Sequence, residues 1–449
     1  MNLTQQLQTL LHDAAGMEAL YQDARNHNRQ DAFTEALEAQ YELAPENLLL
    51  AAWHHRLSRA EGLRIPTVRA GIHWRFVLPF GALLTLFFFL VTGIDETFLK
   101  GAIAWLPILI FTVEALVLCA YLVLAGRQPW RWPLAVTLTL CLLAGWAMVF
   151  SVASLRAQTG ELGFLSVHEQ YYQLAIIHSL GAAALAVIWV AVRNRGANET
   201  RHAVFLRAVE VGITAGLFSS AGGFAFMIGY GLFGALGIRF QEEIIMRAGM
   251  SVAYGFIPLL AMAATYEPTL SPEQQDFNRG FSRVVAFILR LLLPVALVGL
   301  VVYLAVIPFF FWAPFNDREV LIIYNVFLFA VIGTVVGASP LSLEQLKPGQ
   351  RVWLRNGLLS IAVLTIIISL YALAAVTYRT AQSYFTANRV TVIGWNIINI
   401  SLLVLMGVRM LRSWRTDWAA AVNRTIHHGL VVYSAWVVML LILLPLLFR

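Results

Sequence analysis

From Phe76 to the end of the chain, long apolar stretches alternate with short polar segments. An α-helix needs about 20 apolar residues to cross the hydrocarbon core of a bilayer, and most of these stretches are long enough. The pattern predicts an all-α protein, a polytopic transmembrane helix bundle with about eleven spans. We place the spans near residues 76 to 94, 102 to 125, 133 to 155, 172 to 192, 208 to 236, 250 to 265, 284 to 308, 320 to 338, 357 to 376, 390 to 408 and 429 to 448.

Composition agrees with a membrane protein and argues against a nucleic-acid binder. Hydrophobic residues make up 59% of the chain, charged residues only 12%, and the mean hydropathy is +0.72. A soluble protein of this size needs more polar surface. The formal net charge of +6 comes mostly from arginines scattered between apolar runs, without a basic block. Cys119 and Cys141 lie inside apolar runs and are interpreted as small core residues.

The first 70 residues differ from the rest of the chain. They contain nine of the 25 acidic residues and no run long enough to span a bilayer. Their apolar residues recur at helical spacing, so we predict a small amphipathic helical segment over 1–70, followed by a transmembrane helical domain over 71–449. We favour a simple helical cap over a tetratricopeptide-like hairpin, because no clean repeat is present. We recognise no secretory signal peptide at the start.

The distribution of basic residues predicts the orientation in the membrane. If the N-terminal segment is cytoplasmic, the inside segments hold 22 Lys and Arg residues and the outside loops hold seven. Cytoplasmic loops carry the excess of positive charge in membrane proteins. We therefore expect the N-terminus in the cytoplasm and the C-terminus on the periplasmic or extracellular side.

Glu114 is the strongest single candidate for a functional residue. It lies near the middle of the second span, where a carboxylate is costly unless it is protonated, paired or facing a polar cavity. The alternative is a neutral glutamate that hydrogen-bonds to a neighbouring helix. Arg207 and Glu210, three residues apart near the end of a span, are interpreted as an interfacial ion pair.

The fifth span is rich in glycine and contains Ser219 and Ser220 followed by Ala-Gly-Gly. We favour close packing of this helix against a neighbour through its small residues. The alternative is a helix break in which Ser219 and Ser220 line a solute or ion site, since glycine-interrupted spans often mark transporter sites.

A polar stripe follows the polar segment 377–389. Arg389, Asn396 and Asn399 project from one side of the tenth span. We favour hydrogen bonding between helices for this stripe, and Asn396 and Asn399 are also candidates for binding a solute or ion. We expect Arg389 to find partners inside the bundle, and Arg379 to face lipid or solvent.

The same region resembles a known family. Tyr378-Arg379, then Tyr384 through Asn388-Arg389, leads into an apolar span, and "FNRGFSRVVAFILRLLLPVALVGLVVYL" precedes it with Pro294 in the expected place. Residues 280–410 are thereby similar to an uncharacterised family of bacterial multi-pass membrane proteins, domain of unknown function 4153. Arg379, Tyr384, Asn388 and Arg389 carry the signature, although Phe385 and Val390 depart from it. The resemblance implies the bacterial inner membrane and no established activity.

Three functions remain open from the sequence. The first is a transporter or permease for a small solute, suggested by Glu114 and the fifth span. The second is a non-transporting scaffold or sensor whose residues 1–70 dock a cytosolic protein. The third and weakest is an enzyme acting on a lipid-linked substrate, because no nucleophile, metal set or other catalytic motif is recognised. No cofactor is expected.

Overall fold

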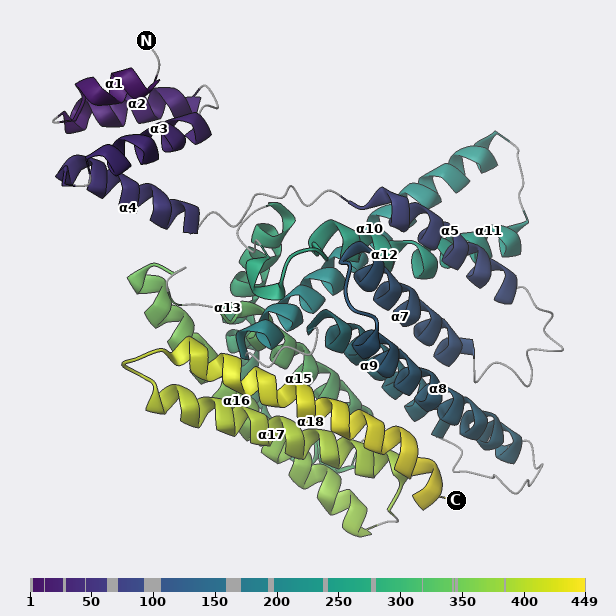
Figure 1. Cartoon of the computed structure of the whole chain (residues 1–449). Coiled ribbons are helices and arrows are strands. Elements are labelled where there is room, and N and C mark those ends of the chain that lie inside the picture. The colour runs from purple at the N-terminus through teal and green to yellow at the C-terminus, as the bar shows by residue number, and fades with distance from the viewer. Residues whose placement is uncertain are drawn as a thin grey trace. The chain divides into compact units, whose positions relative to one another are not determined.

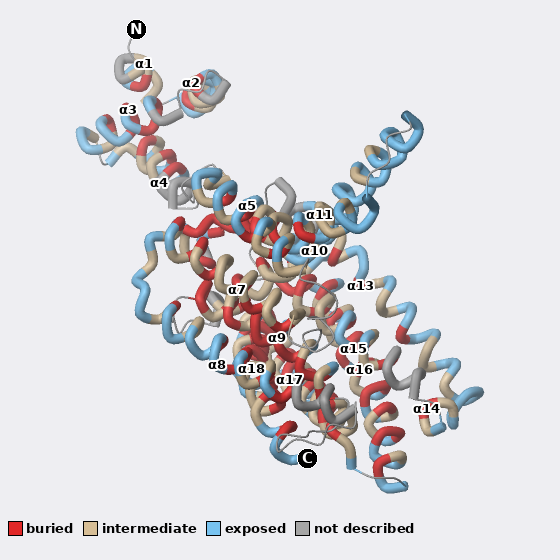
Figure 2. The backbone as a smooth tube through the Cα atoms, turned by 90° about the vertical axis from the view of Figure 1, so that its right-hand side faces the viewer, coloured by how far each residue is buried: buried red, intermediate tan, exposed pale blue. Residues whose placement is uncertain are grey.

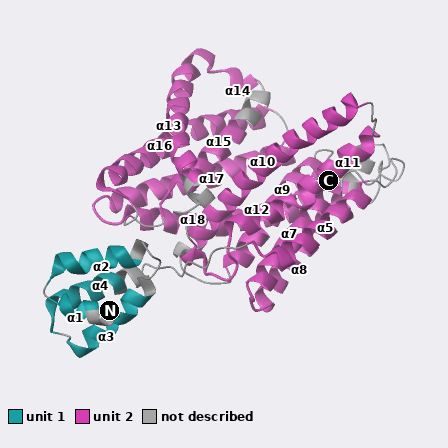
Figure 3. Cartoon of the chain, turned by 90° about the horizontal axis from the view of Figure 1, so that it is seen from above, with its two compact units in different colours: residues 1–70 teal, residues 71–449 magenta. Residues whose placement is uncertain are grey.

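The structure is a computed structural model of the whole chain. It describes residues 3–11, 13–26, 30–44, 46–62, 72–92, 106–158, 171–192, 198–236, 241–275, 280–316, 318–340, 343, 346–382 and 385–448. The chain divides into two compact units, Met1–Ala70 and Gly71–Arg449, which Figure 3 colours separately. Every regular element in the described residues is helical.

The first unit consists of short helices around a small core. They are α1 (Leu3–Thr9), α2 (Ala14–Asn26), α3 (Gln30–Leu43) and α4 (Leu48–Gly62). Asp13 and Asn47 begin α2 and α4, because their side-chain oxygens accept hydrogen bonds from backbone N–H groups of the first turn. The helical spacing of apolar residues places one face of each helix inside, with Met17, Phe33 and Trp53 among the buried residues.

The second unit contains the long helices, which are labelled in Figure 1. They are α5 (Trp74–Val91), α7 (Leu106–Ala125), α8 (Arg131–Gln158), α9 (Tyr171–Val192), α10 (Asn198–Ala235), α11 (Glu242–Gly255), α12 (Ile257–Thr265), α13 (Gly280–Val306), α14 (Ala313–Asn316), α15 (Arg318–Ala338), α16 (Pro348–Gln382), α17 (Ala387–Arg412) and α18 (Trp418–Leu447), with 3-10 turns η1 (Pro272–Gln274) and η2 (Ile307–Phe310).

Ten helical segments in the described residues are long and apolar enough to cross a membrane, if α11 and α12 together count as one. The predicted span 320 to 338 coincides with α15, whose apolar part Tyr324–Ala338 is shorter than the others. The prediction of an all-α polytopic bundle is confirmed. The protein is an integral membrane protein whose outer apolar side chains contact lipid.

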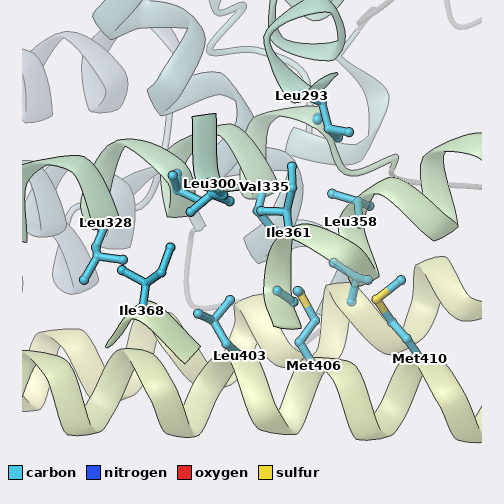
Figure 4. Close-up of a cluster of buried hydrophobic side chains, with 14 of the residues drawn as sticks. Leu293, Leu300, Leu328, Val335, Leu358, Ile361, Ile368, Leu403, Met406 and Met410 are labelled. Atoms are coloured by element: carbon cyan, nitrogen blue, oxygen red, sulfur yellow. The ribbon is translucent and has the colours of Figure 1, made fainter. Parts of the chain in front are cut away.

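Two of the three apolar cores described in the second unit are formed by the following groups of helices. The helices α13, α15, α16, α17 and α18 pack around aliphatic side chains, several of which appear in Figure 4. The helices α7, α8 and α9 pack together and against α18. Figure 2 shows buried residues along these contacts, in contrast to the exposed C-terminal half of α10. Apolar side chains on the outside are the surface expected for helices in lipid, where hydrophobicity alone does not drive burial.

Candidate functional site

Glu114 lies on a cavity inside the second unit. The cavity has a volume of about 300 Å³ and is lined by α7, α9, α10, α12 and the residue that ends α12, Tyr266. Its lining on α7 runs from Phe111 to Leu122, which corresponds to about 16 Å along the helix axis. Apart from Glu114 and Arg207, the walls are almost entirely apolar.

Small residues on two helices explain why space remains beside Glu114. The facing sides of α9 and α10 contribute mainly alanine, glycine and valine, namely Ala183, Ala184, Val187, Ala191, Val204, Ala208, Val211, Gly212 and Ala215. Their short side chains leave space unfilled between the helices. Glu114 itself is half-buried, and it has no hydrogen bond or ion pair with any residue that the structure describes.

A buried ion pair stands on α10 next to this cavity. Nη1 of Arg207 donates to Oε2 of Glu210 over 2.5 Å, and each side chain is only 4% exposed. Arg207 also lines the cavity. The sequence placed this pair at the membrane interface, but the structure buries it between helices. Pairing is what makes the burial of both charges tolerable, because an isolated charge there would be costly.

The chain breaks its helix next to the cavity, between α11 and α12. The break falls at Phe256, and Pro258, in the first turn of α12, lines the cavity. Proline suits a first turn because it has no N–H to donate. Gly255, which ends α11 just before the break, lets α11 approach α5 closely. A Cβ at this position would lie 2.6 Å from the backbone nitrogen of Thr85 in α5. The sequence "GFIP" contains the signal for this break, which the hydropathy pattern did not predict.

The glycine-rich fifth span differs from both interpretations made from the sequence. The helix α10 runs unbroken from Asn198 to Ala235, so no break opens at Ser219 and Ser220. Both serines are exposed, and Ser220 Oγ donates to the Gly216 carbonyl oxygen within the same helix. Close packing is absent as well, since a Cβ added at any of seven α10 glycines would meet no atom within 4 Å in the described structure: Gly212, Gly216, Gly222, Gly223, Gly229, Gly231 and Gly234.

The polar stripe of α17 joins three helices. Asn396 Nδ2 donates to Asn325 Oδ1 of α15 over 3.0 Å and to the Val392 carbonyl oxygen over 2.9 Å. Tyr433 of α18 donates to Asn399 Oδ1 over 2.7 Å. Both asparagines are buried. The contacts with Asn325 and Tyr433 are the interhelical hydrogen bonds that we favoured over solute binding from the sequence. Asn399 also lines a second cavity of about 220 Å³.

Three of the signature residues lie near the end of α16 or in the first turn of α17. Thr386 begins α17, and its hydroxyl accepts a hydrogen bond from the Arg389 backbone N–H over 3.4 Å. Asn388 and Arg389 are half-buried in the first turn, while Tyr384 lies outside the described residues. Arg379 is half-buried near the end of α16, and its Nη1 is shielded from solvent without an acceptor among the described residues. The orientation of Arg379 toward lipid or solvent stays a prediction.

The described residues contain no group of three or more His, Cys, Asp or Glu side chains that could hold a metal ion.

The cavity beside Glu114 brings together Glu114, Arg207 and Tyr266. Ser219, Ser220 and the asparagines of α17 do not line it. Comparisons with protein families, with curated proteins and with solved structures give no match to this chain.

Proposed function

We propose that this membrane protein is a transporter or permease for a small solute, and that the cavity beside Glu114 is its solute site. The observation that carries the proposal is a carboxylate without a partner among the described residues, on an apolar cavity between membrane-spanning helices. Ionisable residues inside the membrane are costly, and they commonly mark solute or proton pathways.

Two neighbouring features support this proposal. The break between α11 and α12 borders the cavity, and discontinuous spans are a common way to build a transporter site. Arg207, which lines the same cavity, is neutralised by its ion pair with Glu210. Glu114 has no such ion pair among the described residues, so it can gain or lose a proton when solute enters. This would couple solute movement to proton movement.

Proteoliposomes that contain a pH-sensitive dye test the coupling. We expect one or more small solutes from a panel to drive proton movement with the wild-type protein, and Glu114→Gln to abolish it. Glu243→Gln, at an exposed position of α11, is the matched control and should behave as wild type. Solute-dependent proton movement that is equal in Glu114→Gln and wild type would overturn the assignment.

A scaffold or sensor is the second candidate, because Met1–Ala70 forms a compact unit with its own apolar core. As a scaffold, the unit docks a cytosolic protein, and its exposed Leu43 and Leu48 provide apolar contact surface. Deletion of residues 1–65 should then remove specific proteins from the set that co-purifies with the full chain. An unchanged set would count against this candidate.

The location of the protein in the cell is part of the same proposal. We propose that the chain is a member of the domain of unknown function 4153 family and lies in the bacterial inner membrane, with its N-terminus in the cytoplasm. The signature residues around the α16–α17 turn and the distribution of Lys and Arg support this.

A further inference from the structure

A cluster of basic side chains lies where α17 ends and where α10 and α18 begin. We call Arg201, Arg409, Arg424 and His427 the basic cluster. Arg201 Nη1 lies 3.1 Å from His427 Nε2, and Arg424 is within electrostatic reach of Arg409. Among the residues that the structure describes, no carboxylate forms a salt bridge with any of the four. The cluster therefore concentrates positive charge at one end of the bundle.

Two donors in the basic cluster lack an acceptor. A guanidinium group only donates, so His427 Nε2 accepts from Arg201, and the ring proton of a neutral His427 is on Nδ1. His427 Nδ1 and Arg201 Nε are both shielded from solvent, and neither has a partner in the described part of the chain. Shielded donors without acceptors are rare in folded proteins, and a bound anion is one way to satisfy them.

An apolar cavity reaches the same place. The second cavity, of about 220 Å³, lies between α10, α15, α17 and α18, and Leu403 and Met406 of Figure 4 are part of its wall. Thr425 belongs to this wall, and its hydroxyl accepts a hydrogen bond from Arg409 Nη1 over 3.3 Å. A residue of the cavity wall therefore contacts the basic cluster. It is separate from the Glu114 cavity, since the two share no lining residue.

We propose that this region binds an anionic phospholipid, with the headgroup phosphate at the basic cluster and an acyl chain in the 220 Å³ cavity. Charge complementarity selects the headgroup, because Arg pairs with phosphate through short, charge-assisted hydrogen bonds. The apolar walls select a tail. A free phosphate ion would use only the basic cluster and would leave the cavity empty. Basic pockets between membrane helices near the headgroup layer are suited to such lipids.

The test uses the purified full-length protein in a neutral detergent, with melting temperature and native mass spectrometry as readouts. Phosphatidylglycerol should raise the melting temperature and remain bound in the mass spectrometer, whereas phosphatidylcholine and inorganic phosphate should do neither. Arg409→Gln should weaken the affinity for phosphatidylglycerol at least tenfold. Arg412→Gln removes the same charge one turn further along α17, at an exposed position, and should leave the affinity unchanged.

A second variant tests the tail. Gly333 lines the cavity, and a Cβ added there meets no atom within 4 Å, so Gly333→Leu can fill the space without a clash at its first carbon. We expect this variant to melt as wild type in detergent alone and to bind phosphatidylglycerol at least tenfold more weakly. Equal stabilisation by phosphatidylcholine would overturn the proposal. So would full stabilisation by inorganic phosphate, or an unchanged affinity in Gly333→Leu, even if Arg409→Gln does not fold.

Discussion

Tyr433 and Asn399 illustrate how single polar contacts join helices in this protein. Replacing Tyr433 with Phe keeps the ring but removes the 2.7 Å hydrogen bond to Asn399. We expect Tyr433→Phe to lower the stability by about 1 kcal/mol, the typical size of a hydrogen bond between membrane helices. Thermal unfolding in detergent measures this. Tyr254→Phe, at an exposed position of α11, is the control and should melt as wild type; equal melting of both variants would contradict the prediction.

Glu18 gives the first unit a dependence on pH. Hydrogen bonds from Gln22 and Arg56 lower the pKa of Glu18 below its ordinary value of 4.5. A lowered pKa in the folded state means that the contribution to stability is present above about pH 4.5 and is lost as the pH falls through the folded-state pKa. Hydrogen exchange in α2 and α4 of the full chain, corrected for intrinsic rates, should show this loss. In Glu18→Gln this part of the pH dependence should be absent, and its persistence would show that another group is responsible.

At the scale of residues, the sequence identified polar positions better than their partners. Because Glu114, Asn396 and Asn399 lie in apolar spans, we predicted that each polar side chain would need a polar partner or a polar cavity. Their neighbours could not be inferred from spacing along one helix, because Asn325 and Tyr433 lie 71 and 34 residues away. The same limit applied to Arg207 and Glu210: their pairing follows from the i, i+3 spacing, but their burial depends on helices elsewhere in the chain.

Glycines provide the sharpest test at the scale of elements. Gly255→Ala would place a Cβ against the backbone of α5, whereas Gly223→Ala on α10 meets open space. We expect Gly255→Ala to cost about 1 to 3 kcal/mol, as overpacking does. Gly223→Ala should be neutral or stabilise by about 0.5 to 1 kcal/mol, because alanine is the better helix former. Thermal unfolding compares the two, and a clear loss of stability in Gly223→Ala would reveal a partner packed against α10.

At the same scale, hydropathy placed the helices but not their breaks. The apolar runs around 208 to 236 and 250 to 265 both became helices, as predicted. The many glycines of α10 left a helix break open as the alternative to close packing. That break is absent, since the backbone hydrogen bonds of α10 close within one helix whatever its side chains. Pro258 and the close contact of Gly255 with α5 instead divide the next span. A helix break thus depended on one proline and one tertiary contact, not on glycine content.

For the whole molecule, the main prediction is its orientation. With eleven spans and the N-terminus inside, residue 317 lies on the outer side. After replacement of Cys119 and Cys141, a cysteine at Asp317 should react with an impermeant maleimide in intact cells. A cysteine at Gln274 is the control and should react only after the membrane is opened. Labelling of position 317 only after the membrane is opened would contradict the predicted topology.

The fold class could be predicted for the whole molecule because the bilayer leaves few choices. An apolar run of sufficient length has to satisfy its backbone within a helix, so composition alone indicated the bundle. Which helices touch is a different matter. The contact of α18 with both α9 and α17 depends on side-chain shapes along three separate spans, and no local pattern in the sequence encodes it.

The length of α10 affects the membrane itself. Its candidate membrane-spanning segment Arg201–Ala235 has 35 residues, a length of about 52 Å, whereas the hydrocarbon layer is about 30 Å thick. A tilt of about 40°, the upper end of the usual range, would still leave about 40 Å along the bilayer normal. Either the lipids beside α10 stretch to match it, or its glycine-rich end lies among the headgroups. In the first case hydrophobic mismatch makes the bilayer beside this helix different from the bilayer around the rest of the bundle.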